Sequence, residues 1–439
     1  MTTRRLLLAA VVAAIAATTI LLGGVLRRES AQAGAGIAVA DVAGDRLQAG
    51  FGAGSTTGLI ASIEQALRER PRDARALTLL GLAYQQRARE LGDPSYYPRS
   101  ERALRRALEL DPQNAQAVGG LGSLALARHR FAEALALGRR ARRLAPHVAY
   151  NEGVVGDALI ELGRYDAAFR AYDRMAALKP SLSSYARVSY ARELLGRSQA
   201  ALAAMGLAVG ASGARGEAAA WTRVQLGKLL FSLGRVREAA LEYRMALVAF
   251  PGYVHALDSL AHTEAARGRI RHAIALEREA SERNPLPQFV GALGDLYRLQ
   301  GRETAAREQF RLVAAIERLL VANGVRTELE TAQFNLDHGV RIGQSLELAK
   351  SAHRARPSIV SDDLLAWALE RNGRCGTALR HSRRALRLGT RDAMMFFHRG
   401  MIERCLGREG AARAWFGRAL RLNPHFSLIW APVARKALA

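Results

Sequence analysis

Residues 251–285 read PGYVHALDSLAHTEAARGRIRHAIALEREASERNP, a stretch that runs from one proline to the next over 34 positions. The same step separates Pro112, Pro146 and Pro180. A fixed period of this length is typical of a repeat architecture, in which each unit packs mainly on its neighbours. The period therefore decides the fold class before any other feature of the chain.

Each period contains two amphipathic segments separated by a turn glycine. The first segment carries a Leu-Gly step, as in Leu293-Gly294, and the glycine allows the second helix to approach closely. The second segment carries a large apolar residue between two alanines, as in Ala239, Tyr243 and Ala246, which places all three on one helix face. Because Ala and Leu dominate the apolar residues and β-branched runs are scarce, we expect almost no strand.

This pattern resembles the tetratricopeptide repeat over residues 57–424. The resemblance implies an all-α fold, a right-handed superhelical α-solenoid of about ten helix pairs, with a capping helix expected at 425–439. Segments such as DPSYYPRSERALRRAL (93–108) and LDHG (336–339) are similar to uncharacterised bacterial tetratricopeptide proteins with an N-terminal export or anchor segment. The family resemblance implies a non-enzymatic scaffold that binds a protein or peptide.

The period is irregular in three places. An insert at 90–97 lengthens one turn and is expected to expose two tyrosines. The stretch 206–218 loosens the fourth repeat, and 312–345 combines an over-long helix with a degenerate repeat. Specificity beyond that of a generic solenoid is expected near these places.

Residues 1–33 form a targeting or anchoring segment. Two arginines precede an uncharged stretch at 6–26, which is long enough to span a bilayer, and 31–33 match a signal-peptidase pattern. A cleaved export signal, a retained membrane anchor and a buried helix of the fold remain as alternatives. The first two place the repeats outside the cytoplasm, at the cell envelope. Residues 34–56 are rich in Gly and Ala and are expected to form a flexible linker.

The net charge of +24 comes almost entirely from arginine, since the chain has only four lysines. One interpretation is an anionic partner: an envelope polymer, a lipid surface or RNA. The other is a compositional habit without a binding role. An export segment disfavours nucleic acid. The basic runs fall mostly on the second helices, so an arginine-rich convex face is the alternative binding surface.

The first helices of such a solenoid line its concave groove, and their polar and aromatic residues are the candidates for binding a peptide segment. Trp221 and Trp367 are expected to act as apolar anchors, and the acids to select basic side chains. The alternative is that these residues are ordinary solvated positions. The candidates are Tyr150, Asp157, Glu161, Trp221, Gln225, Lys228, His255, Asp258, His262, Asp295, Asp363, Trp367, Glu370, His398 and Arg404.

No nucleophile elbow, phosphate loop or zinc-protease helix occurs in the sequence, so we expect neither an enzyme nor a cofactor. His255, Asp258 and His262 share a helix face, but without further ligands they do not predict a metal site. Cys375 and Cys405 lie at the same rim of adjacent repeats, and an oxidising compartment favours a disulfide between them. Two separate buried thiols are the alternative.

Overall fold

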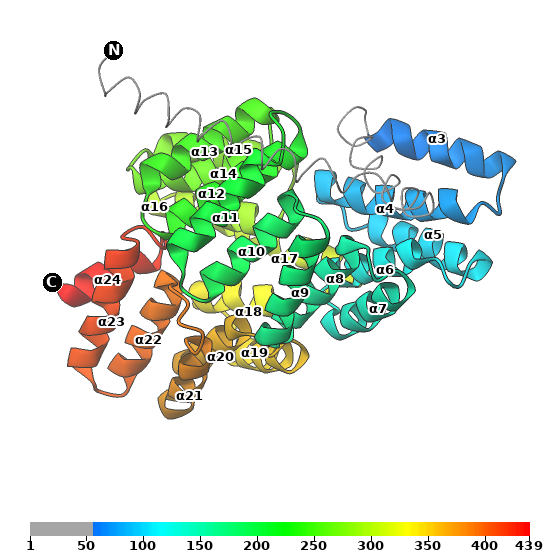
Figure 1. Cartoon of the computed structure of the whole chain (residues 1–439). Helices are drawn as coiled ribbons and strands as arrows, with labels where there is room; N and C mark the ends of the chain where they lie inside the picture. Colours follow the sequence, from blue (N-terminus) through cyan, green and yellow to red (C-terminus); the bar gives the residue numbers. More distant parts are fainter. Residues whose placement is uncertain (1–55) are drawn as a thin grey trace, which may run out of the picture. The chain divides into compact units, whose positions relative to one another are not determined.

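The computed structural model describes residues 56–439. The expected export or anchor segment at 1–33 lies outside the described residues, as does the linker up to residue 55. The described part contains 22 helices, α3 to α24, and no strand (Figure 1). The predicted all-α fold is confirmed. Between residues 56 and 439 we find no helix with the length and apolar character needed to cross a membrane.

Ten helix pairs, numbered here in chain order, follow α3 (Thr56–Glu69). Pairs 1 to 5 are α4 (Ala74–Leu91) with α5 (Tyr96–Leu110), α6 (Ala115–Ala127) with α7 (Phe131–Leu144), α8 (Ala149–Glu161) with α9 (Tyr165–Leu178), α10 (Leu182–Leu194) with α11 (Ser198–Gly210), and α12 (Glu217–Ser232) with α13 (Val236–Ala249). Pairs 6 to 10 are α14 (Val254–Ala266) with α15 (Ile270–Arg283), α16 (Pro287–Leu299) with α17 (Glu303–Ala322), α18 (Glu328–Asp337) with α19 (Ile342–Ala355), α20 (Ile359–Arg371) with α21 (Cys375–Ala385), and α22 (Ala393–Cys405) with α23 (Glu409–Leu422). The single helix α24 (Trp430–Leu438) ends the solenoid, close to where a capping helix was expected.

The turn inside each pair ends the first helix with a residue in the left-handed region. In pair 3 this residue is Gly163, with a φ of 66°. The N–H of Arg164 donates to the carbonyl of Leu159 at 2.8 Å, which completes a Schellman cap. Pair 2 departs from the pattern, because His129 occupies the left-handed position with a φ of 56°.

Glycines of the first helices receive large side chains of the second helices, as the sequence predicted. A Cβ on Gly156 would collide with the ring of Tyr172, and one on Gly294 would collide with Phe310. Ala168 and Ala306, one turn before these two large residues, are fully buried. Interlocking of this kind fixes the two helices of a pair against each other, because a packed interior tolerates little change of volume.

The irregular places are only partly as expected. Helix α4 has 18 residues, against 13 in α6, and ends at Leu91, so the insertion lengthens this helix as well as the turn before α5 begins at Tyr96. Tyr96 and Tyr97 are half-buried rather than exposed, because the ring of Tyr96 packs on Tyr84 at a centroid distance of 6.0 Å. The over-long helix is α17, with 20 residues, and the short α18 follows it.

The solenoid also contacts itself at long range in a regular way. Each turn inside pairs 1 to 5 contacts the loop that follows the pair five places later, and we refer to these as coil contacts. In chain order they join Gly92 with Asn284, His129 with Arg326, Tyr165 with Ile359, Leu194 with Thr390, and Phe231 with Asn423. Four of them involve direct hydrogen bonds between residues 192 to 197 positions apart.

The first helices of neighbouring pairs adjoin one another. Helix α4 packs on α6, α6 on α8, α12 on α14, and α20 on α22. Second helices pack mainly on the first helices before and after them. First helices therefore lie at the smaller radius of the coil, and their uncovered side is called the inner face below.

Candidate functional site

A polar group with several mutual hydrogen bonds lies on the inner face, on α8 and α10. The guanidinium of Arg187 holds the carboxylate of Asp157 with two hydrogen bonds, from Nε at 2.8 Å and from Nη2 at 2.7 Å. The phenol of Tyr172, on α9, donates a third hydrogen bond to the same carboxylate at 2.9 Å. A carboxylate with three donors is rigidly placed, so Asp157 and Arg187 form a fixed, nearly neutral pair on the inner face.

Two exposed tyrosines accompany this pair. Tyr150, in the first turn of α8, is 45% exposed, and Tyr190, on α10, is 38% exposed. Although part of each ring is exposed, the protein that surrounds the phenols on the inner face desolvates them and raises the pKa of both, and the charges of nearby acids, Asp157 among them, raise it further. Both phenols therefore stay protonated and can donate and accept hydrogen bonds. We call Tyr150, Asp157, Arg187 and Tyr190 the tyrosine patch.

Two glutamates border the tyrosine patch. Burial raises the pKa of Glu161, while the guanidinium of Arg356, at 3.6 Å, acts in the opposite direction. Burial, together with the charge of Asp392, raises the pKa of Glu193 to about 7. The charge on this border of the patch therefore changes around neutral pH.

The candidate residues on α12 have the packing and exposure that are usual for a helix surface. Trp221 is half-buried and packs against two apolar clusters, one of which includes Met205. Gln225 is half-buried, and Lys228 is exposed. Trp221 thus has a packing role within pairs 4 and 5 that accounts for its position.

His255 and its neighbours on α14 do not share one site. The ring of His255 packs edge-on between Tyr253 and Phe289, at centroid distances of 5.4 and 5.5 Å. Burial lowers the pKa of His255, and the charge of Lys228 adds to that effect. The histidine is therefore held by aromatic packing and is neutral at physiological pH.

Asp258 and His262 turn instead toward Glu277 of α15. The Nδ1 atom of His262 lies 3.6 Å from Oδ1 of Asp258. Glu277 is fully buried, and both of its carboxyl oxygens lack a hydrogen-bond partner among residues 56–439. Burial, and the charge of Asp258, raise the pKa of Glu277 to about 10, so this carboxyl is neutral at physiological pH.

Asp295 is engaged with a residue from a neighbouring pair. Its Oδ1 atom lies 2.8 Å from Nε2 of His338, which is the C-terminal cap of α18. Asp295 thus links pairs 7 and 8. Helix α18 ends at Asp337, directly before this histidine.

The sequence-based role of Trp367 as a ligand anchor is wrong, because this side chain is fully buried. Trp430 of α24 packs edge-on against it at 5.3 Å, and His398 stacks on it at 4.5 Å. Both indole N–H groups, those of Trp367 and Trp430, donate to Asp337. The last helix covers the first helices of pairs 9 and 10 and converts their inner side into core.

Of the neighbouring candidates, His398 and Asp363 are corrected for the same reason. His398 is fully buried, and its Nδ1 lies 2.8 Å from Oδ2 of Asp363, which is also buried. Glu370 is half-buried, and burial raises its pKa. Arg404 is half-buried over the ring of Phe416. His398 and Asp363 therefore belong to the C-terminal core, whereas Glu370 and Arg404 keep part of their surface exposed.

The two cysteines are bonded to each other in the structure. Cys375 is the first residue of α21 and Cys405 is the last residue of α22, with a Cα–Cα distance of 6.0 Å. The bond joins pair 9 to pair 10 across their shared rim.

Sequence reasoning missed the residues of α10. Tyr190 occupies the place in its repeat that Asp157 occupies one repeat earlier, 33 positions before it. A comparison of equivalent repeat positions would have found Tyr190. No local pattern indicates the pairing of Arg187 with Asp157, because it joins two different repeats.

The match to a family model agrees with this architecture. Residues 86–149 and 364–425 match the family model described as tetratricopeptide repeat. No curated protein matches the chain in sequence. Among solved structures, the human IFIT1 dimer with PPP-AAAA is similar at 16% identity and a TM-score of 0.48, covering 75% of this chain and 77% of that one.

Two further solved structures are similar to the chain. The Cut9–Hcn1 hetero-tetramer of the APC/C matches at 15% identity and a TM-score of 0.38, covering 83% of this chain and 76% of that one. TTC0263, a thermophilic repeat protein of Thermus thermophilus, matches at 22% identity and a TM-score of 0.38, covering 46% of this chain and 98% of that one.

Proposed function

Because this chain is a tetratricopeptide repeat protein, and so has the fold of a protein–protein interaction scaffold, we propose that the tyrosine patch binds an extended segment of a protein partner. The observation that carries the proposal is the exposure of Tyr150 and Tyr190 beside a fixed Arg187–Asp157 pair. Exposed tyrosines on a rigid surface offer large contact area at a small cost in side-chain entropy.

The chemistry of the patch favours a particular kind of segment. The phenol rings provide apolar faces, and their hydroxyls can pair with the peptide groups of an extended chain. Because Arg187 and Asp157 neutralise each other, Glu161 and Glu193 dominate the border of the patch. A segment with an apolar residue next to a basic residue fits this arrangement, and its affinity is expected to rise as Glu193 ionises.

The test is a selection of peptides from a phage-displayed library on the purified chain, followed by fluorescence anisotropy with a selected peptide. Y150A and Y190A should each weaken binding by about tenfold or more, as expected for an aromatic anchor. The matched control is L241A, which removes a side chain that is 56% exposed on the second helix α13. Unchanged affinity in both tyrosine variants would remove the patch as the site.

We place the protein at the cell envelope, as part of the same proposal. Support comes from the uncharged stretch at 6–26 and the cleavage pattern at 31–33 in the sequence. Fractionation of cells, with the N-terminus of the mature chain determined by mass spectrometry, distinguishes a cleaved signal from a retained anchor. Recovery of the intact chain in the cytoplasmic fraction would contradict the proposed location.

Binding of a polyanion to the second helices is the second candidate function. The observation that favours it is the exposure of Arg139, Arg140 and Arg143 on α7, together with Arg383 and Arg384 on α21. Binding of this kind weakens steeply with salt, whereas peptide binding at an aromatic patch weakens little. Titration with polyphosphate at two salt concentrations therefore separates the two functions, and R139A/R140A should affect only the polyanion.

A further inference from the structure

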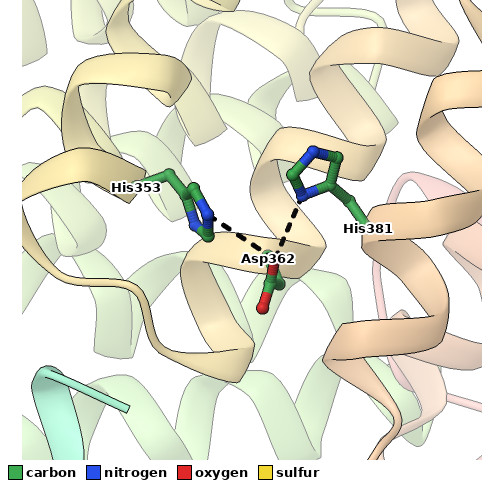
Figure 2. Close-up of side chains that lie close together, drawn as sticks. All are labelled: His353, Asp362 and His381. Atoms are coloured by element: carbon green, nitrogen blue, oxygen red, sulfur yellow. Dashed lines mark hydrogen bonds and ion pairs between the residues drawn. The ribbon is translucent and has the colours of Figure 1, made fainter.

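Three side chains from neighbouring helix pairs converge outside the inner face. His353 lies near the end of α19, Asp362 lies in the first turn of α20, and His381 lies on α21 (Figure 2). Oδ1 of Asp362 lies 3.1 Å from Nδ1 of His381 and 3.8 Å from Nε2 of His353. One ligand atom from each residue lies within 4.8 Å of the other two.

Hydrogen bonding fixes the tautomer of His353. The hydroxyl of Ser361 has one hydrogen, which it donates to a backbone carbonyl, that of Arg356 at 2.5 Å or that of Ser358 at 3.0 Å. The same hydroxyl lies 3.1 Å from Nδ1 of His353, so it accepts a hydrogen bond there. In the neutral ring the lone pair is then on Nε2, which faces the carboxylate of Asp362.

This geometry leaves two electron pairs facing each other with no proton between them. A neutral imidazole opposite a buried carboxylate is unfavourable unless a cation lies between the two groups. The lone pairs of Nε2 of His353 and Oδ1 of Asp362 therefore face a common point, which a divalent cation can occupy.

The second oxygen of Asp362 is already occupied. Arg387 donates to Oδ2 at 3.0 Å, and its guanidinium also lies over the ring of Tyr165. Oδ1 lies at hydrogen-bond distance, 3.1 Å, from Nδ1 of His381, so a metal ion bound there would take the place of the proton between these two atoms. A hydrogen bond to the other oxygen is the usual support for a ligating carboxylate. The positive charge of Arg387 lowers the affinity of the site for any cation. The bonds from the three ligands to the cation must therefore outweigh this repulsion.

We propose that His353, Asp362 and His381 bind one late first-row divalent ion, of which Zn²⁺ is the representative. Two imidazole nitrogens and one carboxylate oxygen are the donors that Zn²⁺ takes in three-ligand sites, whereas Ca²⁺ and Mg²⁺ prefer oxygen donors alone. The side chains of His353 and His381 are 21% and 15% exposed, so the fourth position opens toward solvent. Because Arg387 adds positive charge, an anionic fourth ligand, hydroxide or a carboxylate, is favoured.

The ion would join pair 8 to pair 9 next to a coil contact. Ile359, whose N–H is bonded to Tyr165, precedes Asp362 by less than one helical turn. Metal binding would therefore tie α19 to the start of α20 at the place where this part of the solenoid contacts α9. This role is independent of the tyrosine patch.

The experiment uses the purified full chain and ZnCl₂, in competition with a chromophoric chelator. We expect one Zn²⁺ per chain, and H353Q and H381Q should each weaken binding by about tenfold or more. The matched control is H272Q, which removes a histidine whose Nδ1 lies 3.3 Å from Glu264 on another part of the solenoid. Affinity that is equal in all four proteins, or no uptake by the wild type at millimolar Zn²⁺, would overturn the proposal.

Two further measurements keep the test independent of the stability of the variants. Co²⁺ bound to wild-type protein should give the visible absorption bands of a four-coordinate site with nitrogen ligands, and their absence would count against the proposal. S361A removes the acceptor that sets the tautomer of His353, and about a 10- to 100-fold loss of Zn²⁺ affinity is expected. Far-UV circular dichroism establishes that each variant is folded before its affinity is compared.

Discussion

The backbone N–H of Ile359 donates a hydrogen bond of 2.7 Å to the phenol oxygen of Tyr165, which lies 194 positions earlier in the chain. Ile359 begins α20, and Tyr165 begins α9. The bond is buried and connects a turn inside pair 3 with the loop that follows pair 8. The bond is one of the five coil contacts. Its contribution to stability therefore measures how firmly one part of the solenoid packs on another.

Removal of this acceptor should destabilise the protein. In Y165F the buried N–H of Ile359 loses its partner, and a loss of about 1–3 kcal/mol in the free energy of unfolding is expected. Urea denaturation followed by circular dichroism measures the change. Y185F serves as the control, since Tyr185 is only half-buried and packs at the edge of an apolar cluster. Equal stability of Y165F and wild type would mean that the contact is not maintained in solution.

The turn glycines provide a matched test of the coil contacts. Gly163 and Gly268 both have positive φ, 66° and 77°, so alanine costs about 1–2 kcal/mol at either position. A Cβ at Gly163 would also collide with the carbonyl oxygen of Pro357, whereas a Cβ at Gly268 meets nothing within 4 Å. G163A should therefore lose about 1–3 kcal/mol more than G268A in the free energy of unfolding. Equal losses in a denaturation experiment would contradict the packing of pair 3 on the loop after pair 8.

Glu277 should make stability depend on pH. Its pKa, about 10 in the folded state, lies above the ordinary value of 4.5, so the folded state holds a proton that the unfolded state releases. The associated stability is complete below pH 4.5 and is lost as pH rises toward 10. E277Q, which cannot ionise, should gain up to about 4 kcal/mol relative to wild type between pH 5 and pH 8, at about 1.4 kcal/mol per pH unit.

Thermal denaturation at several pH values measures this difference. E282Q, at an exposed position of the same helix, is the control and should follow wild type throughout. A constant difference between E277Q and wild type from pH 5 to pH 8 would show that Glu277 does not carry the expected proton.

The Cys375–Cys405 disulfide should stabilise the C-terminal pairs. It closes a loop across a sequence separation of 30, for which chain-entropy arguments give about 3–4 kcal/mol. C375A/C405A should lose about this amount, and reductant should destabilise the wild type but not the double variant. Mass spectrometry of the non-reduced protein tests the bond directly, and two alkylated thiols in protein isolated from its own compartment would rule it out.

The sequence predicted the local architecture well, because that architecture depends on short separations. The Leu-Gly step of a first helix and the Ala-aromatic-Ala spacing of the second lie within one 34-residue period, and Gly294 receives Phe310 as expected. The same reasoning failed for Trp367. Its position in a first helix predicted an open groove, but α24 packs Trp430 onto it.

The tyrosine patch was only partly predictable. Tyr150 and Asp157 were identified from their place in the repeat, whereas Arg187 and Tyr190 were not. The reason is that the carboxylate of Asp157 is held from the next repeat, and the direction of a side chain across that boundary depends on the packing of both pairs. The convergence of His353, Asp362 and His381 over three helices was equally invisible in the sequence.

The sequence by itself determined the repeat, the helix pairs, their turns and their apolar interlocking, since each of these depends on residues within about one period. Tertiary structure alone decided the coil contacts and the covering of the last pairs by α24. A coil contact depends on a small rotation between neighbouring pairs, accumulated over five pairs, before Tyr165 can reach Ile359. No local sequence pattern encodes this accumulated rotation. The rotation decides which first-helix residues remain open to a partner.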